Sequence, residues 1–222
     1  MKKIKNSWVS RVVVMAFLFV AVQVPPVAVQ IANRHPSNQV LVIAWMTLFI
    51  VLMLAVIWLA RRTYLNYNKL GVGRGLKLGW ILGGFLVILL GSDILSALNM
   101  MIYHQGETAN NAALGSLLGH NPIITIVFSF SAVVLSPIAE EFIFRGALTN
   151  MFFRPTRLWP KVILSGIVFS LGHASTNPIS FLIYAFMGMV LAFVYLQSGD
   201  LRNSIAIHMA NNLIATVALL MY

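Results

Sequence analysis

Two adjacent carboxylates stand out among the residues that could do chemistry. Glu140 and Glu141 are followed by Arg145, at five and four positions. On a helix, Glu141 and Arg145 are i, i+4 neighbours that can pair, whereas Glu140 points about 100° away. Two acids side by side in a low dielectric rarely both stay ionised without a cation, so pairing of Glu141 would leave Glu140 free to activate water.

Two further motifs offer imidazoles and an amide. Phe169 and His173 form an i, i+4 pair, and so do His208 and Asn212. An imidazole can position a group or donate a proton, and a carboxamide can stabilise a developing oxyanion. Asn211 stays open as the alternative amide. Three helices that each carry one polar stripe could therefore build a hydrolytic site together.

These motifs lie in a chain that is too apolar for a water-soluble globule. Of its 222 residues, 59% are hydrophobic and 9% are charged, and the mean hydropathy is +0.87. Ordinary soluble domains are about 45 to 50% apolar and about 25% charged. Because there is no cysteine, disulfides, thiolate metal ligands and cysteine nucleophiles are excluded. The sequence predicts one integral-membrane domain.

The apolar segments that must position the motifs predict an all-α, polytopic transmembrane bundle. A helix needs about 20 apolar residues to cross the membrane. We expect about seven spans, with an eighth, broken element left open. The fourth is too long, with a kink expected at Pro137, and the fifth is short. The segments are 12–32, 40–60, 78–101, 122–151, 159–173, 178–197 and 204–222. Residues 1–121 would supply three spans and residues 122–222 four.

The basic residues predict the orientation of these spans. The opposite loops hold Arg34 alone, and Arg145 lies within a span. By the positive-inside rule, the chain is a multi-pass protein of the cell membrane with a cytoplasmic N-terminus and an external C-terminus. The net charge of +10 then indicates contact with anionic lipid and not with nucleic acid. The remaining Lys and Arg all fall on one side: Lys2, Lys3, Lys5, Arg11, Arg61, Arg62, Lys69, Arg74, Lys77, Arg154, Arg157, Lys161 and Arg202.

Taken together, the three motifs resemble the CPBP family of intramembrane proteases, also called the CAAX protease, bacteriocin-processing or Abi family. The family pattern is Glu-Glu-x-x-x-Arg, Phe-x-x-x-His and His-x-x-x-Asn, which occurs in this order at 140–145, 169–173 and 208–212. The resemblance covers about residues 122–222. It implies a CAAX-protease-like endopeptidase that cleaves a membrane-associated peptide or protein, in peptide processing or bacteriocin self-immunity.

The resemblance also implies a role for each motif residue. Glu140 with His173 would activate the attacking water, and His208 with Asn212 would stabilise the tetrahedral oxyanion. The other motif residues would be supporting: Glu141, Arg145 and Phe169.

Metal dependence is a separate question. The family is commonly named a metalloprotease, and zinc could accept Glu140, His173 and His208 as ligands. Against this, the chain has no His-Glu-x-x-His array, and the family's prenyl-protein members are described as metal-independent glutamate proteases. We expect no cofactor, with a divalent metal such as zinc as the alternative.

Other interpretations of the polar residues stay open. Glu141 and Arg145 could simply hold two helices together. The same residues could line the pocket of a non-catalytic immunity or binding protein, or of a small transporter. We expect Asp93, in the third span, to hydrogen bond within the bundle, with binding of a proton or substrate as the alternative. At 1.5 Å per residue, His208 lies only about 9 Å beyond Arg202, shallower than the other motifs.

Overall fold

The computed structural model describes residues 7–68, 70, 73–118, 121–154 and 156–221. Among these residues the chain forms helices and no strand. Six of the described segments are long and apolar enough to cross a membrane, and α9 (Leu158–Leu171) is a shorter apolar helix of 14 residues. The all-α polytopic bundle is therefore confirmed, and the fifth apolar segment is the short one. No eighth span is found in the described part of the chain.

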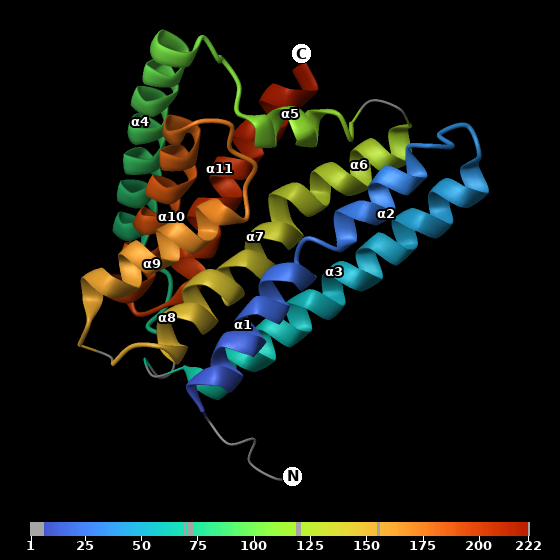
Figure 1. The fold of residues 1–222 in the computed structure, drawn as a ribbon. Helices are drawn as coiled ribbons and strands as arrows, with labels where there is room; N and C mark the ends of the chain where they lie inside the picture. The colour runs from blue at the N-terminus through green and yellow to red at the C-terminus, as the bar shows by residue number, and fades with distance from the viewer. Residues whose placement is uncertain (1–6, 69, 71–72, 119–120, 155, 222) are drawn as a thin grey trace, which may run out of the picture.

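The first two crossings lie side by side (Figure 1). The first is divided into α1 (Trp8–Ala21) and α2 (Pro25–Ala32), because the two prolines at the start of α2 lack backbone donors. The second is α3 (Gln39–Tyr67), which extends beyond the predicted span at its C-terminal end. It packs against α2 and also against the segment that carries the two glutamates.

The long fourth segment is one tilted rod with two π-helical stretches. Its parts are α6 (Pro122–Phe130), η1 (Ser131–Leu135), α7 (Ser136–Glu140), η2 (Glu141–Ala147) and α8 (Leu148–Met151). The disturbance expected at Pro137 therefore takes the form of wider π turns on both sides of α7. In a π turn the backbone bonds span five residues instead of four, and such turns are frequent at functional sites.

Three helices close the bundle. These are α9, α10 (Pro178–Ser198) and α11 (Leu201–Met221), and α10 packs against α4 (Leu78–Tyr103), α9 and α11. Two glycines let α9 approach α10 closely: a Cβ atom on Gly188 would lie 2.8 Å from Gly166 Cα. Small residues at a membrane helix interface allow such backbone contact. This contact holds α9 against the centre of the bundle although α9 is short.

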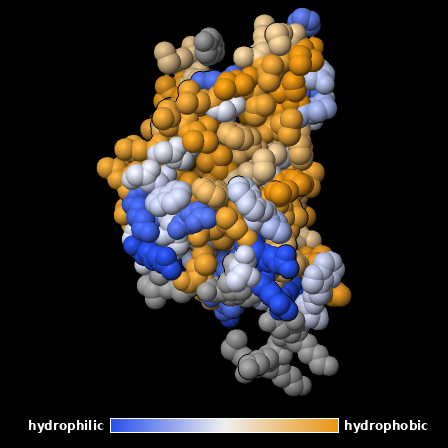
Figure 2. Space-filling model, turned by 90° about the vertical axis from the view of Figure 1, so that its left-hand side faces the viewer, coloured by the Kyte–Doolittle hydropathy of each residue, from blue (hydrophilic) through white to orange (hydrophobic). Residues whose placement is uncertain are grey.

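A short helix, α5 (Ala109–Gly115), covers one end of the bundle beside the C-terminal end of α11 (Figure 1). The start of α1 and the end of α11 lie at opposite ends of the bundle (Figure 1). Hydrophilic side chains gather in the lower half of the face shown in Figure 2, the half nearer the N-terminus. Lys2, Lys3, Lys5, Lys69 and Tyr222 lie outside the described residues. Which end faces the cytoplasm stays a prediction, as does the division at residues 121/122.

Candidate active site

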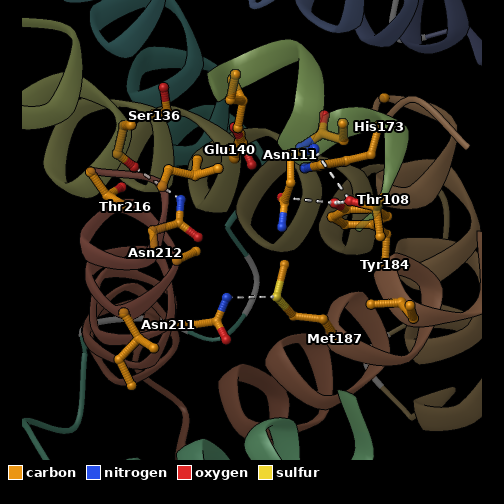
Figure 3. A pocket seen from close by; sticks show the side chains of 18 of the residues that line it. Thr108, Asn111, Ser136, Glu140, His173, Tyr184, Met187, Asn211, Asn212 and Thr216 are labelled. Atoms are coloured by element: carbon orange, nitrogen blue, oxygen red, sulfur yellow. Dashed lines mark hydrogen bonds between the residues drawn. The ribbon is translucent and has the colours of Figure 1, made fainter. Parts of the chain in front are cut away.

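A cavity of about 370 Å³ lies within the bundle. Glu140 at the end of α7, His173 in the turn after α9, and Asn212 on α11 all line it (Figure 3). The alternative amide, Asn211, lines it as well. The structure thus brings three of the four predicted catalytic residues around a single hollow, from three separate segments of the chain.

Glu141, unlike its neighbour, belongs to a buried ion pair. Arg145 Nη1 lies 2.9 Å from Glu141 Oε1, and both side chains are fully buried. The guanidinium also lies over the ring of Phe169, with 4.2 Å from its carbon to the ring centre, and donates to the Gly188 carbonyl at 3.4 Å. A charge this deep is tolerated only when it is paired and hydrogen bonded. The ion pair is the one that the i, i+4 spacing predicts, and Phe169 supports it from α9.

His208 lies between the two glutamates. Its Nδ1 is 2.9 Å from Glu141 Oε1, and its Nε2 is 3.8 Å from Glu140 Oε2. The side chain is buried, and among the described residues His208 is not one that lines the cavity. The resemblance pairs His208 with Asn212 around an oxyanion, whereas the structure places the imidazole behind Glu140.

The depth of His208 also differs from the count along the sequence. That count assumed helices perpendicular to the membrane and left His208 shallower than Glu140. The rod from α6 to α8 instead crosses the bundle obliquely (Figure 1). The two side chains approach to 3.8 Å, so the rod and α11 place Glu140 and His208 next to each other.

His173 is held by aromatic contacts and by a backbone carbonyl. Its Nδ1 lies 2.8 Å from the Phe169 carbonyl oxygen. A carbonyl only accepts, so this bond puts the proton on Nδ1 and leaves Nε2 of the neutral ring free to accept one. The ring centre is 4.4 Å from that of Phe169 and 4.5 Å from that of Tyr184, which stacks on it at 19°. The imidazole is therefore pre-positioned at the cavity wall.

The two asparagines are held differently. Asn212 donates one amide N–H to the Ala132 carbonyl, in η1, at 2.9 Å. A carboxamide has two such donors, so the second remains for a ligand in the cavity. Asn211 donates to the sulfur of Met187 at 3.4 Å, which is a weak acceptor, and has no other side-chain hydrogen bond to a described residue. Asn212 is thus the better fixed of the two.

The comparisons with known proteins agree with this arrangement. The family model of the type II CAAX prenyl endopeptidase Rce1-like proteins matches residues 122–214. This stretch holds all three motifs and all four residues named above as lining the cavity. The matched stretch and the two relatives below support a protease of the CPBP family. At the family level it is a multi-pass membrane protease.

Two relatives of this CPBP protein extend the similarity beyond the motifs. YdiL of Bacillus subtilis (strain 168), named as a candidate membrane peptidase, is 25% identical over 179 residues, which are 80% of this chain and 70% of YdiL. MroQ of Staphylococcus aureus (strain USA300), named a membrane-embedded CAAX protease, is 24% identical over 140 residues, 60% of this chain. The match spans 54% of the length of MroQ. No solved structure matches the chain significantly.

Whether the residues named above bind zinc, or whether no metal is needed, stays a prediction for this CPBP protein. Zinc requires three or four ligand atoms about 2.0 to 2.2 Å from the ion. His208 directs one nitrogen to Glu141 and the other toward Glu140, while His173 engages the Phe169 carbonyl. The described residues contain no group of three His, Asp or Glu side chains that could hold a metal ion.

Several cavity residues carry no signal in the sequence. Tyr184 shares a hydrogen bond of 2.7 Å with Thr108 and donates to Asn111 at 3.3 Å, so α5 is tied to the residue that stacks on His173. A tyrosine in an apolar helix is not distinguishable from packing by its spacing. Asp93 also lines the cavity, but the bond expected for it within the bundle is wrong. Its side chain is exposed at the cavity rim, and it has no hydrogen bond or ion pair in the described part of the chain.

Proposed function

We propose that this CPBP protease hydrolyses a peptide bond of a membrane-associated peptide or protein, with Glu140 as the base that activates water. The observation that supports the proposal is that two adjacent carboxylates have different surroundings. Glu141 is fully buried against Arg145, whereas Glu140 reaches the cavity. A carboxylate that faces a hollow beside an imidazole can accept a proton from bound water.

The steps follow from the groups that line the cavity. Glu140 accepts a proton from a water held near His173, and the water oxygen bonds to the carbonyl carbon of the peptide. The carbonyl oxygen becomes an oxyanion, to which the second N–H of Asn212 donates. The carbon–nitrogen bond then breaks, and the proton on Glu140 passes to the leaving nitrogen. One water is consumed, and a carboxylic acid and an amine are released, which together are a carboxylate and an ammonium group once the acid has passed its proton to the amine.

The buried residues behind Glu140 would act through it. Arg145 keeps Glu141 ionised, Glu141 orients His208, and His208 Nε2 faces Glu140 at 3.8 Å. We therefore assign His208 as a positioning residue of Glu140, in place of the oxyanion role that the resemblance implies. An imidazole wedged between two carboxylates fixes both of them relative to the cavity.

We also propose that the reaction uses no resident metal. The support is the geometry of His208, whose two nitrogens face Glu141 and Glu140 and not a common point with His173. Dialysis against EDTA is expected to leave cleavage unchanged. Loss of cleavage that returns with zinc would contradict this part of the proposal. A role in peptide processing or bacteriocin self-immunity stays a prediction.

The experiment compares Glu140→Gln with the wild type in lipid nanodiscs. Both are incubated with a library of synthetic apolar peptides, and the products are read by mass spectrometry. Glutamine keeps the size of the side chain but cannot accept a proton, so cleavage is expected to fall by about 100-fold or more. Glu107→Gln is the matched control, because Glu107 is an exposed acid that does not line the cavity. It is expected to cleave as the wild type does.

The thermal unfolding midpoint is measured in parallel. It separates lost chemistry from lost structure, and we expect it to change little in Glu140→Gln. Full cleavage by this variant would refute the catalytic assignment. It would favour the non-catalytic binding protein that the same polar pocket could serve.

A further inference from the structure

One carboxylate of the cavity is not used by the proposed mechanism. Asp93 lies in the middle of α4, about 15 Å along the helix from the end at Tyr103. Leu89, Ser92, Asp93 and Ser96 have the i, i+3, i+4, i+7 spacing of one helix face, and all four line the cavity. An apolar spanning helix thus turns a polar stripe, with one acid in it, toward the site of Glu140.

Asp93 has no partner within the described residues. No hydrogen bond or ion pair holds its carboxylate, and the side chain is exposed. An ionisable group in the middle of a membrane span is costly and usually faces a partner or a cavity. Because Asp93 both lines the hollow and is exposed, it lies at the rim, where a ligand would enter. A carboxylate that lies at the rim, without a partner among the described residues, is suited to bind a group of a ligand.

The charges around the cavity define that partner. The cavity-lining side chains include two carboxylates, Asp93 and Glu140, and neither Lys nor Arg among the described residues. Arg145, the nearest cation of the site, is buried behind the wall and used by Glu141. Low-dielectric walls that carry one sign of charge attract the opposite sign. The cavity therefore favours a cationic group.

We propose that Asp93 is a specificity-determining residue that binds a Lys or Arg side chain of the peptide substrate, while the bond to be cut lies at Glu140. The hydroxyl oxygens of Ser92 and Ser96, on the same face of α4, can accept further hydrogen bonds from the cationic group. The inference rests on the proposed function, because it names which peptides the site selects. A free N-terminal amine carries the same charge and is the second source of a cation.

The test uses matched synthetic peptides in nanodiscs. One apolar peptide is made with Lys, Arg, Gln or Glu at each position in turn, with a free or an acetylated N-terminus. Cleavage by the wild type is expected to favour Lys or Arg over Gln by about tenfold at one fixed distance from the cut, as a charge-assisted contact would give. In Asp93→Asn this ratio falls toward one, and in Asp93→Lys the preference moves to Glu. Glu107→Gln keeps the wild-type ratio.

Each other outcome overturns the proposal. A ratio that is unchanged in Asp93→Asn places the cation elsewhere. A preference that disappears on acetylation identifies the N-terminal amine instead of a side chain. A loss that is equal for Lys and Gln peptides shows that Asp93 supports the fold only.

A binding experiment keeps the inference separate from catalysis. Fluorescence anisotropy measures the same peptides, labelled, on Glu140→Gln and on Glu140→Gln with Asp93→Asn. If no peptide is cut by the wild type, the proposed function fails, but tighter binding of the Lys peptide that depends on Asp93 would still uphold this subsite. Equal binding of Lys and Gln peptides to both variants would refute it.

Discussion

Two of the ion pairs among the described residues differ in character, one behind the cavity and one at a helix junction. Arg145 and Glu141 are both fully buried, with 2.9 Å between them. Asp200, between α10 and α11, lies 2.7 Å from Arg202 in the first turn of α11, but the Arg202 side chain is 61% exposed. In the first pair, neither partner can be solvated by water if the other is lost. In the second, the cation is dispensable because water can take its place.

The two acids also serve different structures. Glu141 contacts His208, and His208 in turn lies beside Glu140 at the cavity. Asp200 accepts from the backbone N–H of Gly75 at 2.8 Å, and the neighbouring Asn203 accepts from that of Lys77 at 2.8 Å. These bonds fasten the loop before α4 to the start of α11. The comparison teaches that similar distances carry different consequences, depending on what surrounds the pair.

The largest expected effect is the loss of the buried cation. Arg145→Met leaves Glu141 as an uncompensated buried charge, which costs about 3 to 5 kcal/mol. The measurement is unfolding of the purified protein in detergent. Arg202→Met is the matched control, since it removes an arginine from an exposed pair. Similar losses in both variants would contradict the distinction between the two pairs.

A double variant sharpens the same comparison. Arg145→Met with Glu141→Gln removes both buried charges, so the penalty of an unpaired ion disappears. The double variant is expected to lose less free energy of unfolding than the two single variants lose in sum. The difference, which is the coupling energy of the pair, is expected to be about 0.5 to 3 kcal/mol. Additive losses in the double-mutant cycle would mean that the pair does not act as a unit.

A smaller effect concerns acid at the helix junction. Hydrogen bonds from Arg202 and the Gly75 N–H hold the pKa of Asp200 at about 2, below its ordinary value of 3.8. A depressed native pKa stabilises the fold above the unfolded value and loses that contribution as pH falls through the native one. The thermal midpoint of the wild type is therefore expected to decline between about pH 4 and 2, and that of Asp200→Asn to decline less. Parallel curves would show that Asp200 does not contribute.

The smallest effect is expected at the exposed cation itself. Arg202→Gln removes the guanidinium but leaves the Gly75 N–H on Asp200. Because Arg202 is 61% exposed, water replaces much of the lost donor, so the loss of stability at neutral pH is expected to be at most about 1 kcal/mol. A clear drop would show that this pair behaves more like the buried one than its exposure indicates.

Local geometry explains what could be predicted from the sequence. The ion pair of Glu141 with Arg145 and the contact of Phe169 with His173 follow from i, i+4 spacing, which any helix preserves. The helical class and the membrane spans follow from the runs of apolar residues. These features need no knowledge of how the helices pack.

Packing explains what could not be predicted. The place of His208 between the two glutamates depends on the rotation of α11 and on the tilt of the rod from α6 to α8. The contact of Tyr184 with His173, and the bonds from Tyr184 to α5, join residues that are far apart in the sequence without a shared motif. The rim position of Asp93 likewise depends on which face α4 turns inward. None of these three placements follows from the spacing of residues along the sequence.

The π stretch η1 (Ser131–Leu135) affects which of the two glutamates faces the cavity. A π turn is equivalent to an α-helix with one residue inserted. Winding the same residues as a regular α-helix would rotate everything beyond them by about a quarter turn, because each residue would then advance by about 100°. The Glu140 carboxylate would then no longer face the cavity, and the Glu141 side chain would point in a different direction. Which of the two glutamates faces the cavity therefore depends on how the chain before them is wound, as much as on the glutamates themselves.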